Sequence, residues 1–282
     1  MSSSIADRIP HSSTTAELWR CVSCGSSMNV LNEIPTCGAC GRSYQVESGV
    51  VVVNEDLSGN NQVVRDFYNG PLWPRFRFWE WFTFFSNGGE RRSRNKVLRH
   101  LPKEPGLNLL DVAIGDGVYL PWLPQDWSVV GIDISTSQLD ACKLKAGNRP
   151  LTLSLGEAEN LPFRDGHFDA VLSIGGFNYF NDPEGSLREM VRVTRSGGVI
   201  VISDEIPDLT DYMLGHKLNI GPLKRLERWI VSRWMHLGEE FTDIVETHRT
   251  LDVAAIGRRV LPDCHYERIW RGVGYVLVGR VP

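Results

Sequence analysis

The chain has 282 residues, 42% hydrophobic and 23% charged, which is the composition of a globular protein with a sizeable core and excludes a collagen, a coiled coil and a short disulfide scaffold. Thirty Lys and Arg residues against 34 Asp and Glu give a formal net charge of −4, so a nucleic acid or an anionic membrane would have to bind at a local basic patch. The first twenty residues are polar and no apolar stretch approaches the roughly 20 residues that cross a bilayer, so we expect a cytoplasmic protein.

Two matched Cys-x-x-Cys-Gly turns follow an N-terminus, residues 1–18, that we expect to be flexible. Each turn points two thiolates at one ion, and four sulfurs close the tetrahedral shell that Zn²⁺ prefers. A closed shell leaves no position for substrate, so the sequence predicts a structural zinc site, with a redox pair or cysteines paired by chance as the alternative. The predicted ligands are Cys21, Cys24, Cys37 and Cys40. The segment 19–54 resembles the zinc ribbons of some RNA methyltransferases and of small methyltransferase activator proteins.

A polar stretch and an aromatic stretch come next. Residues 55–64 are predicted to be a linker, because this part of the chain is polar and carries Gly and Asn. Residues 65–104 are predicted to be a helical lead-in, and positions 67–85 hold ten aromatic residues in nineteen. The aromatic stretch either roofs a substrate pocket or packs against the ribbon, and the sequence does not distinguish these roles.

Strands and helices alternate from residue 105. The apolar run 107–114 ends in Gly115-Asp116-Gly117, and the run 128–132 ends at Asp133. Two parallel strands of this kind bring a glycine turn and a carboxylate to the carboxyl edge of a sheet, where open α/β folds bind ligands. A dinucleotide fingerprint, Gly-x-Gly-x-x-Gly, would need a third glycine after Gly117, and here Tyr119 and Leu120 stand where it would fall.

This loop resembles the first motif of the class I S-adenosylmethionine (SAM) methyltransferases, an acid followed by alternating glycines. The resemblance implies that Asp111 contacts the methionine amino group and that Gly115 and Gly117 make room for the cofactor. Ala113 stands where the family has its first glycine. Asp133, with Ile134 beside it, would bind the ribose hydroxyls, and Ser135 is predicted to cap the next helix.

Later segments resemble further motifs of the same family in the expected order. Residues 156–173 look like the segment that recognises adenine, through Glu157 or the backbone of Ala158, and that ends at Ser173. Residues 188–203 and the period-2 hairpin 266–281 complete the pattern. The resemblance implies an α/β fold, a Rossmann-like sheet of seven strands with an antiparallel last strand, over residues 105–282 with a helical insert at about 206–262.

The residues that follow Ser173, after the fourth predicted strand, indicate the acceptor of the methyl group. They lack the Asn/Asp-Pro-Pro-aromatic sequence typical of nucleobase amines, and resemble the branch that methylates small molecules and lipids, including quinone and sterol precursors. Asn178 and Tyr179 are the candidate acceptor contacts, with packing or turn roles as the alternative. His216, His236 and Glu205 are candidate bases, and the sequence favours none of them.

A basic amphipathic helix is predicted within the insert, over residues 222–237. It could lie on a membrane surface at the inner face, cover a lipophilic acceptor together with the aromatic stretch, or pack on the core with its arginines solvated. Its apolar residues recur at helical spacing with basic residues between them: Leu223, Leu226, Ile230, Trp234 and Leu237, interleaved with Lys224, Arg225, Arg228 and Arg233.

Two other functions remain open. The zinc ribbon and the basic cluster 91–96 would suit a methyltransferase acting on ribosomal or transfer RNA bases, although the chain as a whole is acidic. A noncatalytic scaffold with a docking ribbon is the third hypothesis, which the acids and glycines of the loop disfavour. The sequence does not indicate the oligomeric state.

Overall fold

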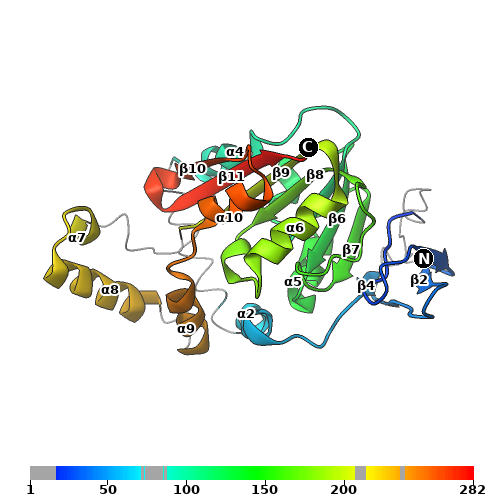
Figure 1. The fold of residues 1–282 in the computed structure, drawn as a ribbon, viewed down its shortest axis with the longest axis horizontal. Coiled ribbons are helices and arrows are strands. Elements are labelled where there is room, and N and C mark those ends of the chain that lie inside the picture. Colours follow the sequence, from blue (N-terminus) through cyan, green and yellow to red (C-terminus); the bar gives the residue numbers. More distant parts are fainter. Residues whose placement is uncertain (1–16, 71–72, 74–84, 86–87, 207–213, 236–238) are drawn as a thin grey trace, which may run out of the picture.

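The computed structural model describes residues 17–70, 73, 85, 88–206, 214–235 and 239–282 (Figure 1). The predicted flexible N-terminus and most of the aromatic stretch therefore lie outside the described residues, as does His236. In these ranges the chain forms a three-layer α/β fold with one large sheet at its centre.

The central sheet has the strand order β10-β11-β9-β8-β5-β6-β7-β4-β3. The strands from β5 to β9 run parallel, and β11 is antiparallel to both of its neighbours, β9 and β10. Their bounds are β5 Asn108–Val112, β6 Ser128–Asp133, β7 Leu151–Leu155, β8 Phe168–Ile174, β9 Thr194–Glu205, β10 His265–Ile269 and β11 Gly274–Arg280.

The sheet holds nine strands in the described residues, and residues 105–282 contribute seven of them, the number expected for that segment. The two additional strands, β3 (Gln45–Glu47) and β4 (Val50–Val52), come from the segment predicted to be zinc ribbon. β4 pairs parallel with β7, with Val52 opposite Leu155. Because β7 would otherwise be an edge strand, this pairing satisfies backbone groups that would be left without partners. The second half of the segment 19–54 thus belongs to the main sheet, whereas its first half forms a separate two-stranded sheet.

Helices cover both faces of the sheet, because the parallel strands are apolar and buried on both sides. One core contains residues of α6 (Pro183–Val193) and α10 (Val253–Val260). The other contains residues of α4 (Glu90–Leu98), the short helix η2 (Leu120–Trp122), α5 (Thr136–Lys143) and η4 (Trp270–Gly272). Ser135 caps α5 as predicted, accepting a hydrogen bond from the Gln138 N–H.

The cysteine-bearing segment packs directly on the first of these cores. It forms a hairpin of β1 (Met28–Leu31) and β2 (Ile34–Cys37). Trp19 is 1% exposed, and its ring lies 5.6 Å from that of Phe163. The Arg20 N–H also donates to the Pro162 carbonyl at 2.8 Å. An indole of this size contributes several kcal/mol when buried, so the hairpin is attached to the sheet domain by a hydrophobic anchor.

The helix α2 (Gly59–Asn69) lies at the carboxyl edge of the sheet, and the helices α7 (Leu214–Lys217) and α8 (Gly221–Met235) lie beyond it. Part of the predicted linker, from residue 59 on, is the first half of α2, which packs against α5, α9 (Glu239–His248) and η3 (Phe177–Tyr179). The helices α7 and α8 project away from the sheet (Figure 1).

In the described ranges, no helix combines the length and apolarity needed to cross a membrane.

Candidate functional site

The loop after β5 has an unusual backbone. Ala113, Gly115 and Gly117 occupy alternate positions and all have positive φ, of 60°, 55° and 67°. Glycine adopts this conformation freely, whereas Ala113 carries a strain of about 1 kcal/mol. A Cβ atom on Gly117 would lie 2.6 Å from Cys142 Sγ, so a side chain does not fit there. The loop is therefore a cradle of backbone with little side-chain bulk, which only small residues can form.

Two buried carboxyl groups flank this cradle. Asp111 in β5 is 4% exposed and Asp133 at the end of β6 is 7% exposed. Asp133 accepts hydrogen bonds from the N–H groups of Gly115, at 2.8 Å, and Ser135, at 2.9 Å. Burial raises the pKa of Asp133 to about 6. Burial and then the charge of Asp133 raise the pKa of Asp111 well above its ordinary value. Two carboxyl groups so close in a buried site favour a cationic ligand.

Buried polar atoms without partners lie beside the same loop. Within the described residues, Ser173 Oγ and Gln138 Oε1 are buried and make no hydrogen bond. Gln138 Oε1 lies 3.9 Å from the place of a Cβ atom on Gly115, and Ser173 pairs with Val112 at the end of β5. SAM carries an ammonium group, a sulfonium and two ribose hydroxyls, which match the two carboxyl groups and the spare polar atoms. The residues present therefore fit this cofactor.

The helix α2 and the segment before it contact the predicted cofactor motifs from outside them. Asn54 and Asn61 donate from their side-chain amides to the two oxygens of Glu157, at 2.8 and 2.9 Å. At the other end of the helix, Asn69 accepts a hydrogen bond from Ser135 Oγ at 2.7 Å. Both oxygens of Glu157, a residue expected to recognise adenine, are thus already hydrogen bonded within the protein. The next residue, Ala158, is 5% exposed.

Sequence reasoning missed Asn61 because residues 55–64 were assigned to a linker, and it gave Asn54 and Asn69, in the ribbon segment and the helical lead-in, no role at the cofactor site. A usable signal was present, since Val64 and Phe67 have the i, i+3 spacing of a helix that buries one face. Phe67 and Val64 pack with Tyr179 and Ile244, and Ile134 lies against the same cluster. The helix α2 therefore lies between the predicted cofactor motifs and η3. The segment η3, from which the sequence predicts acceptor contacts, and the end of β9 beside it are here called the acceptor edge.

The acceptor edge contains a buried polar network. Asn178 is 2% exposed, its backbone N–H donates to Asp204 at 3.1 Å, and its amide donates to the Glu205 carbonyl at 2.6 Å. The Tyr275 hydroxyl donates to the Asn178 amide oxygen at 3.0 Å. The side-chain groups of Asn178, proposed from sequence as an acceptor contact, are thus engaged within the protein. These bonds tie the segment after β8 to the end of β9 and to β11.

Tyr179 and Glu205 form a phenol–carboxylate pair in the same network. The Tyr179 hydroxyl donates to Glu205 Oε1, and the tyrosine is 8% exposed. Burial and then the Glu205 charge raise the pKa of Tyr179 well above its ordinary value, and burial followed by the same charge raises the pKa of Asp204. The phenol is therefore neutral and Asp204 resists ionisation. Of the other two candidate bases, His216 has no described side chain and His236 lies outside the described ranges.

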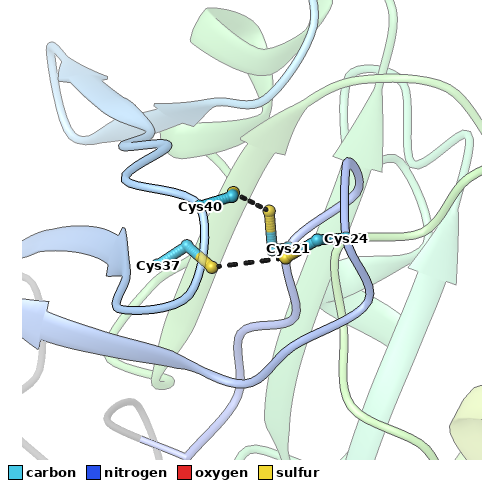
Figure 2. A group of neighbouring side chains, drawn as sticks. All are labelled: Cys21, Cys24, Cys37 and Cys40. Atoms are coloured by element: carbon cyan, nitrogen blue, oxygen red, sulfur yellow. Dashed lines mark hydrogen bonds between the residues drawn. The ribbon is translucent and has the colours of Figure 1, made fainter.

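The four predicted zinc ligands come together in the cysteine segment (Figure 2). Their sulfurs all lie within 4.8 Å of one another, with Cys21 3.5 Å from Cys40 and Cys24 3.5 Å from Cys37. A tetrahedral ion with metal–sulfur bonds of about 2.3 Å needs sulfurs roughly 3.8 Å apart. The glycines that follow each pair, Gly25 and Gly41, have φ of 74° and 76°. The residues present thus fit a tetrahedral metal ion.

The sheet order, the glycine cradle and its two acids define a SAM-binding fold of the methyltransferase type. Comparison with known proteins agrees with this class. A family profile described as methyltransferase domain matches residues 110–202. A methyltransferase from Thermotoga maritima shares the fold, with a TM-score of 0.52 at 15% identity over 79% of this chain and 100% of that one.

Two demethylmenaquinone methyltransferases are more similar in sequence. That of Beutenbergia cavernae is 33% identical over 197 residues, 67% of this chain and 76% of the relative. That of Renibacterium salmoninarum is 37% identical over 121 residues, 42% of this chain, and the match spans half of its own length. The chain therefore belongs to the family of class I SAM-dependent methyltransferases that includes these enzymes.

Proposed function

We propose that this protein transfers a methyl group from SAM to a small lipophilic acceptor of the quinol type. The observation that carries the proposal is the cradle of three positive-φ residues between two buried carboxyl groups. The acceptor class is supported by the relatives, which are named demethylmenaquinone methyltransferases, and by the apolar cluster around Tyr179 at the acceptor edge.

Each cofactor contact follows from the chemistry of the residue at that position. Asp111 would hold the ammonium group and Asp133 the ribose hydroxyls, because an ionised carboxylate accepts from several donors. Gly115 and Gly117 leave room for the cofactor, and Ser173 offers a hydroxyl that has no other partner among the described residues. The adenine edge would lie beside Ile134, Glu157 and Ala158.

The acceptor edge would remove a proton. SAM, when bound, supplies an electrophilic methyl group, and a carbon or oxygen that takes it must lose a proton. Glu205 would receive this proton through the Tyr179 hydroxyl, which passes its own proton to the carboxylate as it accepts the new one. Asn178 would hold the loop in place through its bonds to the Asp204–Glu205 segment.

The direct test is methyl transfer from labelled SAM. We expect the purified protein to label demethylmenaquinol or a short-chain analogue dispersed in detergent, so that label enters the organic phase. Label in RNA instead of the organic phase would overturn the acceptor assignment, and SAM binding without transfer to any extract fraction would favour a scaffold.

An RNA acceptor is less well supported. In the basic cluster 91–96, Arg94 is 2% exposed and pairs with Glu90 at 2.9 Å, so it faces the protein interior. Its guanidinium also lies over the ring of Tyr119, 4.4 Å from the centroid. The cluster therefore presents fewer cations to a phosphate backbone than its sequence suggests.

We also propose that the four cysteines bind one structural zinc ion. We expect Cys21→Ser to remove the metal and to lower the melting temperature by roughly 10 °C, because loss of a metal site can exceed ~4 kcal/mol and 1 kcal/mol is worth about 2–4 °C at this size. Metal analysis and thermal unfolding measure both effects. Cys264→Ser, a half-buried cysteine outside the cluster, is the matched control and should keep the zinc. Full metal content in the Cys21 variant would refute the site.

A further inference from the structure

The helices α7 and α8 form a projecting hairpin, residues 214–235, here called the arm (Figure 1). The hairpin is held closed by one buried carboxyl group. Glu227 is 9% exposed and accepts a hydrogen bond from the Gly215 N–H at 2.7 Å. A Cβ atom on Gly215 would lie 2.5 Å from the same carboxyl group, so a larger residue there would displace Glu227. The arm therefore has a defined turn that fixes α7 on α8.

The arm exposes large apolar side chains. In the ranges that the structure describes, nine large hydrophobic residues are exposed, and five of them lie on this one hairpin. They are Leu214 at 60%, Leu218 at 58%, Ile220 at 43%, Leu226 at 50% and Trp229 at 61%. Scattered apolar side chains are normal on a protein surface, but a concentration on one projecting element marks an interaction site.

The charge of the arm selects the kind of partner. Residues 214–235 include five basic residues and one acid, so their net charge is 5 − 1 = +4, while the whole chain has −4. The one acid, Glu227, is buried against Gly215. A second copy docking arm to arm would place basic residues against basic residues, which is unfavourable. An anionic bilayer offers both an apolar boundary and negative charge.

The arm is also connected to the acceptor edge. It lies between β9, which ends at Glu205, and α9. Ile244 of α9 packs with Tyr179 and Phe67, and Asn60 lies 3.3 Å from the ring of His248. Contact between the arm and a surface would thus bring the acceptor edge near that surface.

We propose that the arm docks on a bilayer containing anionic lipid, with its apolar side chains at the headgroup boundary, and that the acceptor enters from the membrane. The entry of the acceptor from the membrane rests on the proposed function, whereas the docking of the arm on the bilayer does not. The occupant is a lipid surface, and neither a second copy of the chain nor an RNA.

The test is co-sedimentation of the full chain with vesicles of phosphatidylcholine alone or mixed with phosphatidylglycerol, without acceptor. We expect binding to the anionic vesicles that weakens as salt is raised, and at least tenfold weaker binding for the double variant Leu218→Asp/Leu226→Asp. Lys224→Glu/Arg225→Glu should lose the preference for anionic lipid. Leu144→Asp is the matched control, because Leu144 is 88% exposed at the end of α5, and it should bind within twofold of the native chain.

Unchanged melting temperature and SAM affinity verify that the variants are folded. Equal vesicle binding by the native chain and the leucine double variant would overturn the proposal, as would an absence of vesicle binding. A change of oligomeric state in the double variant without lipid would assign the arm to a second copy and overturn it too. Methyl transfer to acceptor in detergent tests the proposed function separately, because that assay contains no bilayer; the double variant should lose transfer only to acceptor embedded in vesicles.

Discussion

Replacing Asp133 by alanine is expected to weaken SAM binding at least 100-fold. Its carboxylate would accept two hydrogen bonds from the ribose, and a hydrogen bond to a charged group is worth about 1.5–3 kcal/mol. The substitution also removes the acceptor of the Gly115 N–H, which helps to shape the cradle. Isothermal titration calorimetry measures the effect. Asp140→Ala is the control, because Asp140 is an exposed acid in α5 that pairs with Lys143, and it should bind SAM as the native chain does.

The same residue predicts a pH dependence. Burial raises the pKa of Asp133 to about 6 in the unliganded fold, so the folded chain holds a proton between pH 3.8 and 6 that the unfolded chain has released. The contribution of this group to stability therefore falls as pH rises through that window. A cationic, hydroxyl-bearing cofactor favours the ionised form, so SAM affinity should decrease as pH falls below about 6, by up to roughly tenfold per pH unit. A flat affinity from pH 7 to pH 5 would contradict the assigned contact.

The second large effect concerns the proton acceptor. Glu205→Gln is expected to lower kcat about 10²- to 10⁴-fold, the range typical of a positioned acid or base, while SAM affinity stays within twofold. Tyr179→Phe should cause a similar loss, because it removes the hydroxyl but keeps the ring that packs against Phe67 and Ile244. Steady-state kinetics in detergent, with the melting temperature as a check on folding, measure both variants.

A double variant of Glu205 and Tyr179 tests whether these residues act together in catalysis or only support the structure. If the hydroxyl and the carboxylate pass one proton in a single step, Glu205→Gln/Tyr179→Phe should be no slower than either single variant. Independent structural effects would instead multiply, and they would lower SAM affinity and the melting temperature as well. Additive losses in kcat would therefore rule out the proton path through Tyr179.

The sequence by itself determined the features that depend on near neighbours in the chain. The alternation of Asp111, Ala113, Gly115 and Gly117 predicted the cradle, because a turn of small residues after a buried strand has few other conformations. The two Cys-x-x-Cys-Gly turns likewise predicted that four sulfurs would meet. The prediction of a SAM-dependent methyltransferase is confirmed by the family to which the chain belongs.

Only the tertiary structure decided which distant residues complete these sites. Asn54 and Asn61 reach Glu157 across 103 and 96 positions, and Tyr275 reaches Asn178 across 97. Such contacts depend on the order of the strands and on how helices pack over the sheet edge, and an isolated asparagine or tyrosine carries no periodic signal of its partner. For the same reason the sequence did not predict that β4 belongs to the main sheet. A run of valines predicts a strand, but the place where that strand pairs depends on the free edge of β7.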